Sequence, residues 1–400
     1  MSTAVATARP TRTLSARQAG WAGIALGAVA WFIALPPALV RTPAPSLVLA
    51  AAAVGGGAWA LRGGERRLGW GAIAAGVAGA AGAVAATHSG VGHLRDVVTW
   101  SALVAATLRY ATPLTFGALG GIVCERSGVI NIALEGMMLM GAFFGIFGAD
   151  LTGSWELGLL VAMIAGGALA LVHAFFAITL RADQIVSGTG LNLLALGVTG
   201  YVFLDHYGDQ GTPDDIPRVP DVSLPGVKSI PFVGDAVGHT NLLTWIALLG
   251  VLALWVYLFR TPSGLRLRSV GESPRAAATV GIGVLRTRYL AVVASGVLAA
   301  LGGAYLSIAF LGSFNQGMTA GRGFIALAAV IFGNWRPGGA LAATLLFGFS
   351  SALAQRLPTF SESSAVLFQA LPYVLTLIAV AGVIGRSRPP AAAGRPYVPE

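Results

Sequence analysis

The sequence predicts an all-α, polytopic membrane protein, and three observations lead to this fold class. Of the 400 residues, 56% are hydrophobic and only 10% are charged. The mean hydropathy of +0.76 suits a chain dissolved in lipid rather than in water. Apolar runs of about 17–25 residues, the length that crosses a bilayer as a helix, recur along the whole chain. We therefore expect a bundle of transmembrane helices, with the lipid bilayer as its immediate partner.

About twelve apolar runs are candidate spans, of which a few are short. In order they are Gly20–Val40, Ser46–Leu61, Leu68–Thr87, Val97–Val123, Val129–Ala149, Trp155–Leu180, Ile185–Leu204, Asn241–Phe259, Tyr289–Leu311, Gly323–Phe332, Gly338–Gln355 and Val366–Ile384. An even number of crossings places both termini on the same side of the membrane.

The arginines and aspartates of the loops predict which side that is. Arginines precede the first span, follow the second, fill residues 260–288 and follow the last span, whereas residues 205–240 carry mainly aspartates and several prolines. By the positive-inside rule both termini and the loop 260–288 are cytoplasmic, and the loop 205–240 is an irregular external cap. This distribution also explains the net charge of +9, so no nucleic-acid partner is expected.

Enzymatic motifs are missing from the chain. The single lysine, Lys228, follows Val227 where a phosphate-binding P-loop requires glycine. Cys124 is the single cysteine and the five histidines are scattered, so we expect no metal site, no catalytic residue and no cofactor bound by this chain.

Polar residues interrupt the apolar stretch Thr112–Gly145, which contains Glu125, Asn131 and Glu135. A charge at mid-bilayer depth costs about 2.5–3.5 kcal/mol on insertion scales, so such residues usually face a cavity or a pathway. Asn131 and Glu135 are four residues apart and would share one face of a helix, with a break possible near Ser127-Gly128 or Gly136. They form either the wall of a translocation pathway or a buried polar pair that holds two helices together.

Two further segments carry candidate pathway residues. In the first, Asp183, Gln184 and Asn192 bracket a flexible turn, Ser187–Gly190, which is either part of the pathway or an ordinary capped helix start. In the second, Asn315 and Arg322 precede an apolar run too short for a full span, which predicts a half-helix that enters from outside. Arg322 either serves the pathway or extends to the membrane interface.

The loop 260–288 predicts a short surface helix that docks on a partner. Ser273 is placed to cap it, Pro274 occupies its first position and Gly281 ends it. The alternative is an amphipathic segment lying at the membrane interface, although large apolar residues are few.

Four phrases in this order resemble the permease subunits of bacterial nucleoside and simple-sugar ABC importers, the branched-chain/ribose-type permease superfamily. They are GGIVCERSGVINIALEGMMLMGAF, RADQIVSGTGLNLLALG, TPSGLRLRSVGESPRAAATVGI and GRGFIALAAVIFGNWRPGGA, and the likeness covers about residues 108–384. Cys124 stands where this family more often has serine.

The resemblance implies a core of about ten helices with broken or half helices, preceded here by about two extra N-terminal helices. We place an N-terminal extension at residues 1–95, with about three spans, the permease core at 96–388 and a cytoplasmic tail at 389–400. Asn131, Glu135 and Gly136 match the broken-helix motif beside the pathway. The resemblance also implies the residues that couple the permease to the ATPase. With Arg268 added because of its place in the loop, they are Arg268, Gly271, Glu272, Pro274, Arg275, Ala276, Ala277, Gly281 and Ile282.

The same resemblance implies the partners. They are a separate ABC ATPase subunit that uses the ATP, a second permease chain that is more often a distinct one, and an external substrate-binding lipoprotein, all at the bacterial cytoplasmic membrane. The alternative is an autonomous secondary transporter or channel for a small polar solute, which would transport when expressed alone.

Overall fold

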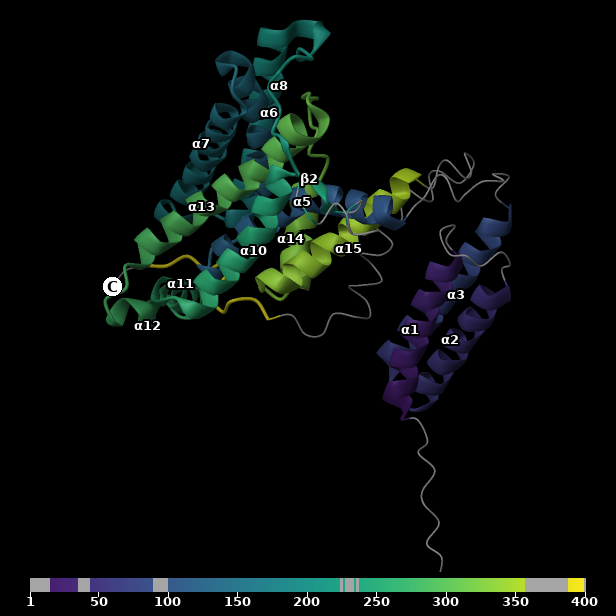
Figure 1. Cartoon of the computed structure of the whole chain (residues 1–400). Helices are drawn as coiled ribbons and strands as arrows, with labels where there is room; N and C mark the ends of the chain where they lie inside the picture. Colours follow the sequence, from purple (N-terminus) through teal and green to yellow (C-terminus); the bar gives the residue numbers. More distant parts are fainter. Residues whose placement is uncertain are drawn as a thin grey trace, which may run out of the picture. The chain divides into compact units, whose positions relative to one another are not determined.

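The described part of the chain forms two compact units. The computed structural model describes residues 15–34, 44–88, 100–223, 226, 234, 237–356 and 388–398. The first unit holds the described residues before residue 100, and the second holds those between 100 and 355 together with 388–398. Helices make up nearly all of the regular structure in both units (Figure 1). The predicted all-α class is confirmed.

Three helices make up the first unit, and small residues let them pack closely. They are α1 (Ala16–Ala34), α2 (Ala44–Arg62) and α3 (Arg66–His88). A Cβ atom on Gly57 of α2 would lie 2.7 Å from the carbonyl oxygen of Gly69 in α3. Glycine is therefore required where these two backbones meet.

One end of this three-helix unit has the composition of a membrane interface. Trp21, Trp59 and Trp70 lie near the start of α1, the end of α2 and the start of α3, and 50%, 56% and 64% of their surfaces are exposed. Arg62 and Arg66 lie at the same end. Exposed tryptophans beside arginines are typical of the boundary between lipid and water.

The second unit is a bundle of longer helices. These are α5 (Trp100–Arg126), α6 (Leu134–Thr152), α7 (Trp155–Ala174), α8 (Gln184–Tyr207), α10 (Leu242–Arg260), α13 (Val284–Ala304), α14 (Arg322–Phe332) and α15 (Pro337–Arg356). The π-helical turns η1 (Phe175–Thr179) and η3 (Tyr305–Leu311) continue α7 and α13. Across the described residues of both units, eight helices are long and apolar enough to cross a membrane.

α13 lies at the centre of this bundle and packs against α5, α6 and α7. Its glycines face neighbouring backbones, as at Gly302, where a Cβ atom would lie 2.7 Å from the carbonyl oxygen of Pro113 in α5. Gly296 meets Gly166 of α7 in the same way. Such close contacts maximise van der Waals packing where no hydrophobic effect drives helices together.

The predicted spans correspond to helices, except that two of them start about five residues away from the predicted start and one span cannot be compared. The span predicted to begin at Tyr289 begins at Val284. The span predicted to begin at Val129 begins instead at Leu134, because residues 127–133 leave the helical conformation. The span Val366–Ile384 lies outside the described residues.

The aspartate-rich end of the second unit is only partly irregular. After α8 come a 3₁₀ turn, η2 (Gly208–Gln210), and two short antiparallel strands, β1 (Asp221–Ser223) and β2 (His239–Asn241). The strands pair Asp221 with Asn241 and Ser223 with His239. Part of the proline-rich stretch between the strands lies outside the described residues.

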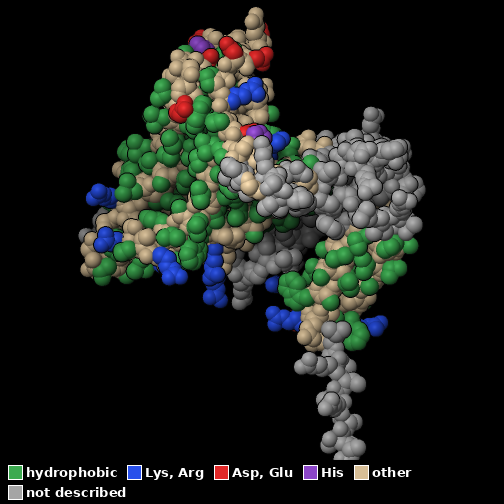
Figure 2. Space-filling view, viewed as in Figure 1, with side chains coloured by type: hydrophobic (Ala, Val, Ile, Leu, Met, Phe, Trp, Pro, Cys, Tyr) green, Lys and Arg blue, Asp and Glu red, His purple; other side chains and the backbone are tan. Residues whose placement is uncertain are grey.

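The opposite end contains two short helices where the sequence predicted one. α11 (Pro262–Glu272) precedes α12 (Pro274–Thr279). Thr261 caps α11 by accepting a hydrogen bond from the Gly264 amide, and Pro262 occupies its first turn, a helix-start pattern that the prediction overlooked. Ser273 precedes α12, but its side chain makes no cap bond. Figure 2 shows Arg side chains around this end and Asp and Glu side chains gathered at the opposite end.

Candidate functional site

The break between α5 and α6 is the centre of the candidate site. α5 ends at Arg126, α6 begins at Leu134, and Ser127 and Val129 between them are fully buried. Gly128 has φ +91°, in the left-handed region that glycine adopts without strain. Backbone that leaves the helix inside a membrane protein needs other hydrogen-bond partners, because no lipid group supplies them.

Side chains of α7 and α8 supply those partners. The Ile130 amide donates to Oε1 of Gln184 at 2.8 Å. Asn192 accepts from the Gly136 amide through Oδ1 at 2.7 Å and donates through Nδ2 to the Ile132 carbonyl at 3.0 Å. Gln184, Asn192 and Gly136, which the sequence singled out in two separate segments, thus meet at one break.

His173 adds a contact that sequence reasoning missed. Its Nε2 lies 3.1 Å from the Ile130 carbonyl, and its Nδ1 lies 3.2 Å from the Ser187 hydroxyl of α8. His173 is fully buried. A histidine inside an apolar run was the available signal, but its partner is far away in the sequence.

The predicted helical face shared by Asn131 and Glu135 is wrong. Asn131 lies in the irregular segment, where its Nδ2 donates to the Ser295 hydroxyl of α13 at 3.0 Å, whereas Glu135 lies in the first turn of α6. The Asn131 Oδ1 is buried and has no hydrogen-bond partner among the described residues. The four-residue spacing implies a common face only if the helix continues through it.

Glu135 joins α6 to α14. Its two carboxylate oxygens accept hydrogen bonds from the amides of Gly321 at 2.8 Å and Gly323 at 2.6 Å. α14 has 11 residues and no side-chain cap of its own, so Glu135 caps it from another helix. A carboxylate is favourable there because helix N-termini carry partial positive charge. The predicted half-helix is present, and its start meets the start of α6.

Asn315 lies in the loop before α14, and Arg322 is the first residue of that helix. The Nη1 of Arg322 donates to the carbonyls of Met318 at 2.9 Å and Thr319 at 3.0 Å, which ties the loop to the helix start. The Asn315 side chain is exposed.

Asp183 caps the start of α8, next to Gln184, which hydrogen-bonds to the break. Its Oδ1 accepts from the amides of Ile185 at 2.8 Å and Val186 at 3.0 Å, which is an ordinary helix cap. The predicted turn at Ser187–Gly190 is wrong, because those residues belong to the first turns of α8. The strong cap at Asp183 starts the helix before the glycines.

Glu125 lies in the last turn of α5, directly before the break. Its Oε2 accepts from the Trp335 indole nitrogen at 2.5 Å. The neighbouring Arg126 donates through Nε and Nη2 to the Trp335 carbonyl at 3.1 and 2.9 Å. The pair joins α5 to the turn between α14 and α15, where Asn334 and Trp335 both have positive φ.

The predicted coupling residues divide into buried and exposed groups. Ala277 is buried against Val270 and Val284, so it faces its own chain and not a partner. The guanidinium of Arg268 lies 5.1 Å from the centre of the Phe259 ring, and Gly271 packs directly on the carbonyl of Arg126.

The remaining coupling residues lie nearer the surface of this end. Ile282 donates its amide to the Ala277 carbonyl at 3.1 Å, and Gly281 has φ +81°. Pro274 is half-buried, whereas Glu272, Arg275 and Ala276 are exposed. Val280, which the sequence did not single out, is 75% exposed.

The C-terminal segment 388–398 contacts both the break and α11, which sequence reasoning missed. The Gly394 amide donates to the Gly128 carbonyl at 3.2 Å, and the Ala392 amide donates to the Gly271 carbonyl at 2.9 Å. Arg288, which is fully buried, donates to the Ser127 carbonyl at 3.2 Å and the Arg395 carbonyl at 3.1 Å. Each of these contacts ends on a backbone carbonyl, and a backbone group carries no sequence signature.

The hydrogen bonds of the site join several helices to one another. Two helix starts, α6 and α14, share one carboxylate, and one irregular segment is held by α7, α8 and α13. Among the described residues, no group of three or more His, Cys, Asp or Glu side chains is placed to hold a metal ion. Broken helices that meet inside a bundle are characteristic of transport proteins.

Comparison with known proteins agrees with this geometry. Residues 103–380 match the family described as branched-chain amino acid transport system / permease component. The guanosine ABC transporter permease protein NupQ of Bacillus subtilis is 45% identical over 74% of this chain and 97% of its own length.

Two further relatives are 40% identical to the chain. They are the nucleoside ABC transporter permease protein NupC of Lactococcus lactis, matched over 76% of this chain and 98% of its own length, and the putative glucose ABC transporter permease protein TsgC13 of Haloferax volcanii, matched over 65% and 78%. No solved structure matches. The family match covers most of the chain, including the break between α5 and α6 and the half-helix α14. The chain therefore belongs to this family of permease components and is a multi-pass protein of the cytoplasmic membrane.

Proposed function

We propose that this chain is the membrane-spanning permease subunit of an ATP-driven importer for nucleosides or related simple sugars. The observation that carries the proposal is the 45% identity to a guanosine permease over 97% of that relative's length. A second relative is described as a nucleoside permease and a third as a putative glucose permease. Both solute classes are small, polar and rich in hydroxyl groups.

The importer contains partners that this chain does not replace. A separate ABC ATPase subunit hydrolyses the ATP, a second permease chain, favoured to be a distinct one, completes the pathway, and an external lipoprotein delivers the solute. This chain binds no cofactor. The break at residues 127–133 and the start of α14 support a pathway role, because the substrate sites of transporters are typically formed by discontinuous helices.

The test of the function is uptake by the reconstituted complex. Proteoliposomes that hold the permease with its co-purified ATPase should accumulate radiolabelled guanosine or glucose when ATP and the binding lipoprotein are supplied. Omission of ATP should abolish uptake. Uptake by this chain alone, driven by an ion gradient, would show an autonomous secondary transporter instead.

We expect the aspartate-rich end to face outward and α12 to face the cytoplasm, with both termini cytoplasmic. The charge distribution of the loops supports this orientation. Asp214 and Val280 are exposed at opposite ends of the second unit, and Cys124 is fully buried. In a Cys124→Ser background, Asp214→Cys should react with an impermeant thiol reagent on intact cells, and Val280→Cys should react only after permeabilisation. The reverse pattern would invert the topology.

The ATPase should dock on the exposed side of α12 and the residues that follow it. Ala276→Trp places a bulky side chain there, and overpacking in a well-packed contact costs about 1–3 kcal/mol, so co-purification of the ATPase and solute-stimulated hydrolysis should fall about tenfold. Ala276 is exposed, so the permease itself should fold normally.

A matched control is Ala182→Trp, because Ala182 is exposed in the loop before α8. It should leave co-purification unchanged. Ala277→Trp is unsuitable, since that residue is buried in its own chain. Normal co-purification and normal stimulated hydrolysis with Ala276→Trp would remove α12 from the coupling interface.

A further inference from the structure

A pocket separate from the break lies near the aspartate-rich end of the second unit. It measures about 230 Å³ and is lined by residues of α5, β1, β2, α10 and η3. Arg109 of α5 is among them. Arg109 precedes the end of α5 by 17 residues, roughly 25 Å at 1.5 Å per residue, so this pocket is far from Glu125 and the break. Its volume lies just below the range of roughly 300–1,000 Å³ usual for drug-sized ligands.

One wall of the pocket is aromatic. The rings of Tyr305 and Phe310 are stacked, with centroids 6.3 Å apart and planes inclined by 9°. The guanidinium of Arg109 lies 5.7 Å from the centre of the Phe310 ring. All three residues line the cavity. Aromatic faces and a guanidinium plane are the surfaces on which a planar heterocycle packs.

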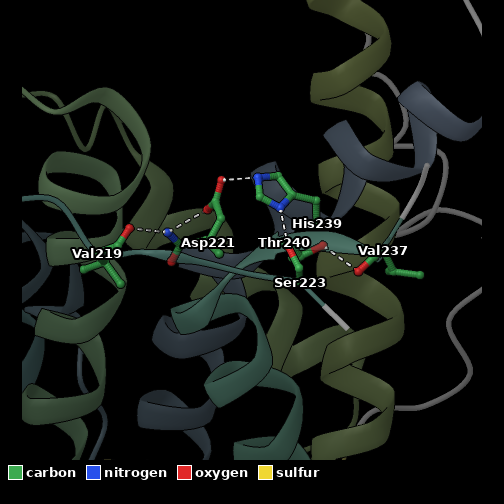
Figure 3. A network of polar contacts seen from close by, with 7 residues as sticks. Val219, Asp221, Ser223, Val237, His239 and Thr240 are labelled. Atoms are coloured by element: carbon green, nitrogen blue, oxygen red, sulfur yellow. Dashed lines mark hydrogen bonds and ion pairs between the residues drawn. The ribbon is translucent and has the colours of Figure 1, made fainter. Parts of the chain in front are cut away.

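The other wall is polar and pre-organised. Figure 3 shows Asp221 between His239 and a neighbouring amide, with Ser223 on the far side of the imidazole. The Asn241 Nδ2 donates to Asp221 Oδ1 at 3.2 Å, and His239 Nε2 lies 3.5 Å from Asp221 Oδ2. The Ser223 hydroxyl lies 3.0 Å from His239 Nδ1. The Asp221 side chain is 48% exposed and that of His239 is 60% exposed, so both are accessible to a solute.

A chain of threonine hydroxyls leads inward from this pocket. Thr244 lines both this pocket and a smaller neighbouring one, and its hydroxyl accepts from Thr112 of α5 at 3.0 Å. Deeper along α5, the hydroxyls of Thr115 and Thr344 of α15 lie 2.9 Å apart. These side chains are at most 3% exposed. Each hydroxyl pair can exchange its mutual bond for bonds to a hydroxylated solute as the helices separate.

We propose that this pocket is the outer binding site of the permease for a nucleoside, with the base against Phe310 and Arg109 and the ribose hydroxyls on Asp221 and His239. Tyr305, which is 2% exposed, supports the Phe310 ring from behind. The threonine pairs form the inward continuation of the site. The inference rests on the proposed function and adds to it a site within the permease that binds solute without the lipoprotein. A solute with a planar ring at one end and hydroxyls at the other matches both walls, whereas a sugar alone engages only the polar one.

The test is direct binding to the permease–ATPase complex in nanodiscs, without the lipoprotein. Radiolabelled guanosine should bind saturably. Asp221→Asn and Phe310→Leu should each weaken guanosine binding by about fivefold or more, since each removes one wall's contact. Asp221→Asn should also weaken competition by ribose, whereas Phe310→Leu should leave ribose competition unchanged.

Matched controls separate local from general effects. Asp215→Asn changes an exposed aspartate of the same loop, and Phe176→Leu changes a phenylalanine of the other π-helical turn. Both should bind guanosine as the unmodified chain does. Asp221 is partly exposed, so its variant should fold even if Phe310→Leu does not.

Different results would overturn the pocket assignment and the proposed function. A complex that imports guanosine but shows no saturable binding without the lipoprotein, or whose binding is unchanged by Asp221→Asn, overturns the pocket assignment alone. A complex that imports neither nucleoside nor sugar overturns the function on which the assignment rests.

Discussion

Glu135→Ala is expected to abolish uptake and to lower the thermal stability of the purified permease. The carboxylate accepts hydrogen bonds from the amides of Gly321 and Gly323, and the variant leaves both donors unpaired inside the protein. Each buried unpaired donor costs about 1–3 kcal/mol. Gly323 is buried and Gly321 is half-buried, so the pair costs at most roughly 2–6 kcal/mol, against the ~5–15 kcal/mol by which domains are usually stable.

Glu135→Gln should have an intermediate effect. Its single amide oxygen can accept from one of the two donors, while its NH₂ group faces the other. A role limited to the charge in a pathway predicts something else, namely that both variants lose uptake equally and keep full stability.

The measurements are the melting temperature in detergent and guanosine uptake in proteoliposomes. Glu156→Ala is the matched control, because Glu156 is an exposed carboxylate in the first turn of α7. It should change neither quantity appreciably. A Glu135→Ala protein with the melting temperature of the unmodified chain would show that the two amide bonds do not hold α14 in place.

Gly323→Ala is expected to be nearly as damaging. A Cβ atom on Gly323 would overlap the backbone nitrogen of Glu135 and would lie 2.5 Å from its Cα. Backbone atoms cannot rotate away, so α14 must shift away from α6, and overpacking of this kind costs about 1–3 kcal/mol or more. The shift also stretches the hydrogen bonds that Glu135 accepts.

The double variant Glu135→Ala with Gly323→Ala provides a sharper test. Because both changes act on one contact, their combined loss of stability should be smaller than the sum of the two separate losses. Full additivity would mean that the two residues act on different parts of the fold.

Gly190→Ala is the control for helix glycines. Gly190 lies in α8. Apart from the backbone of α8 and the two neighbouring residues, no described atom would lie within 4 Å of a Cβ atom added to Gly190. Alanine is the better helix former by about 1 kcal/mol, so this variant should be neutral or slightly stabilising. Damage by both glycine variants would point to a general need for helix flexibility rather than to the α6–α14 crossing.

Several features of the candidate site could be predicted because their causes are local. The short apolar run after Arg322 indicated a half-helix, and α14 is one. The glycine at residue 128 allowed a break, and the chain leaves the helix there. Polar residues in apolar runs also indicated where the interior needs hydrogen bonds, since such residues are costly without partners.

The partners of these polar residues could not be predicted. The Asn192 side chain accepts a hydrogen bond from the Gly136 amide, 56 positions away, and the Glu135 carboxylate accepts one from the Gly321 amide, 186 positions away. The burial of Ala277 also depended on where Val270 and Val284 come to lie. Helical spacing describes neighbours within one helix, and it carries no information on which helices pack together.

The sequence by itself determined the class of the molecule, because apolar content, run length and charge placement depend on the energetics of each residue in lipid. It also indicated the break near Gly128, whereas the break it predicted at Ser187–Gly190 is absent, because Asp183 starts α8 before the glycines. Only the tertiary structure decided which side chains pair with the interrupted backbone and which helices form the pocket. The side chains that pair with the interrupted backbone come from α7, α8 and α13, and the pocket joins α5, α10 and η3. Such contacts arise from the packing of distant helices, because that packing decides which partners lie within reach of a buried polar group.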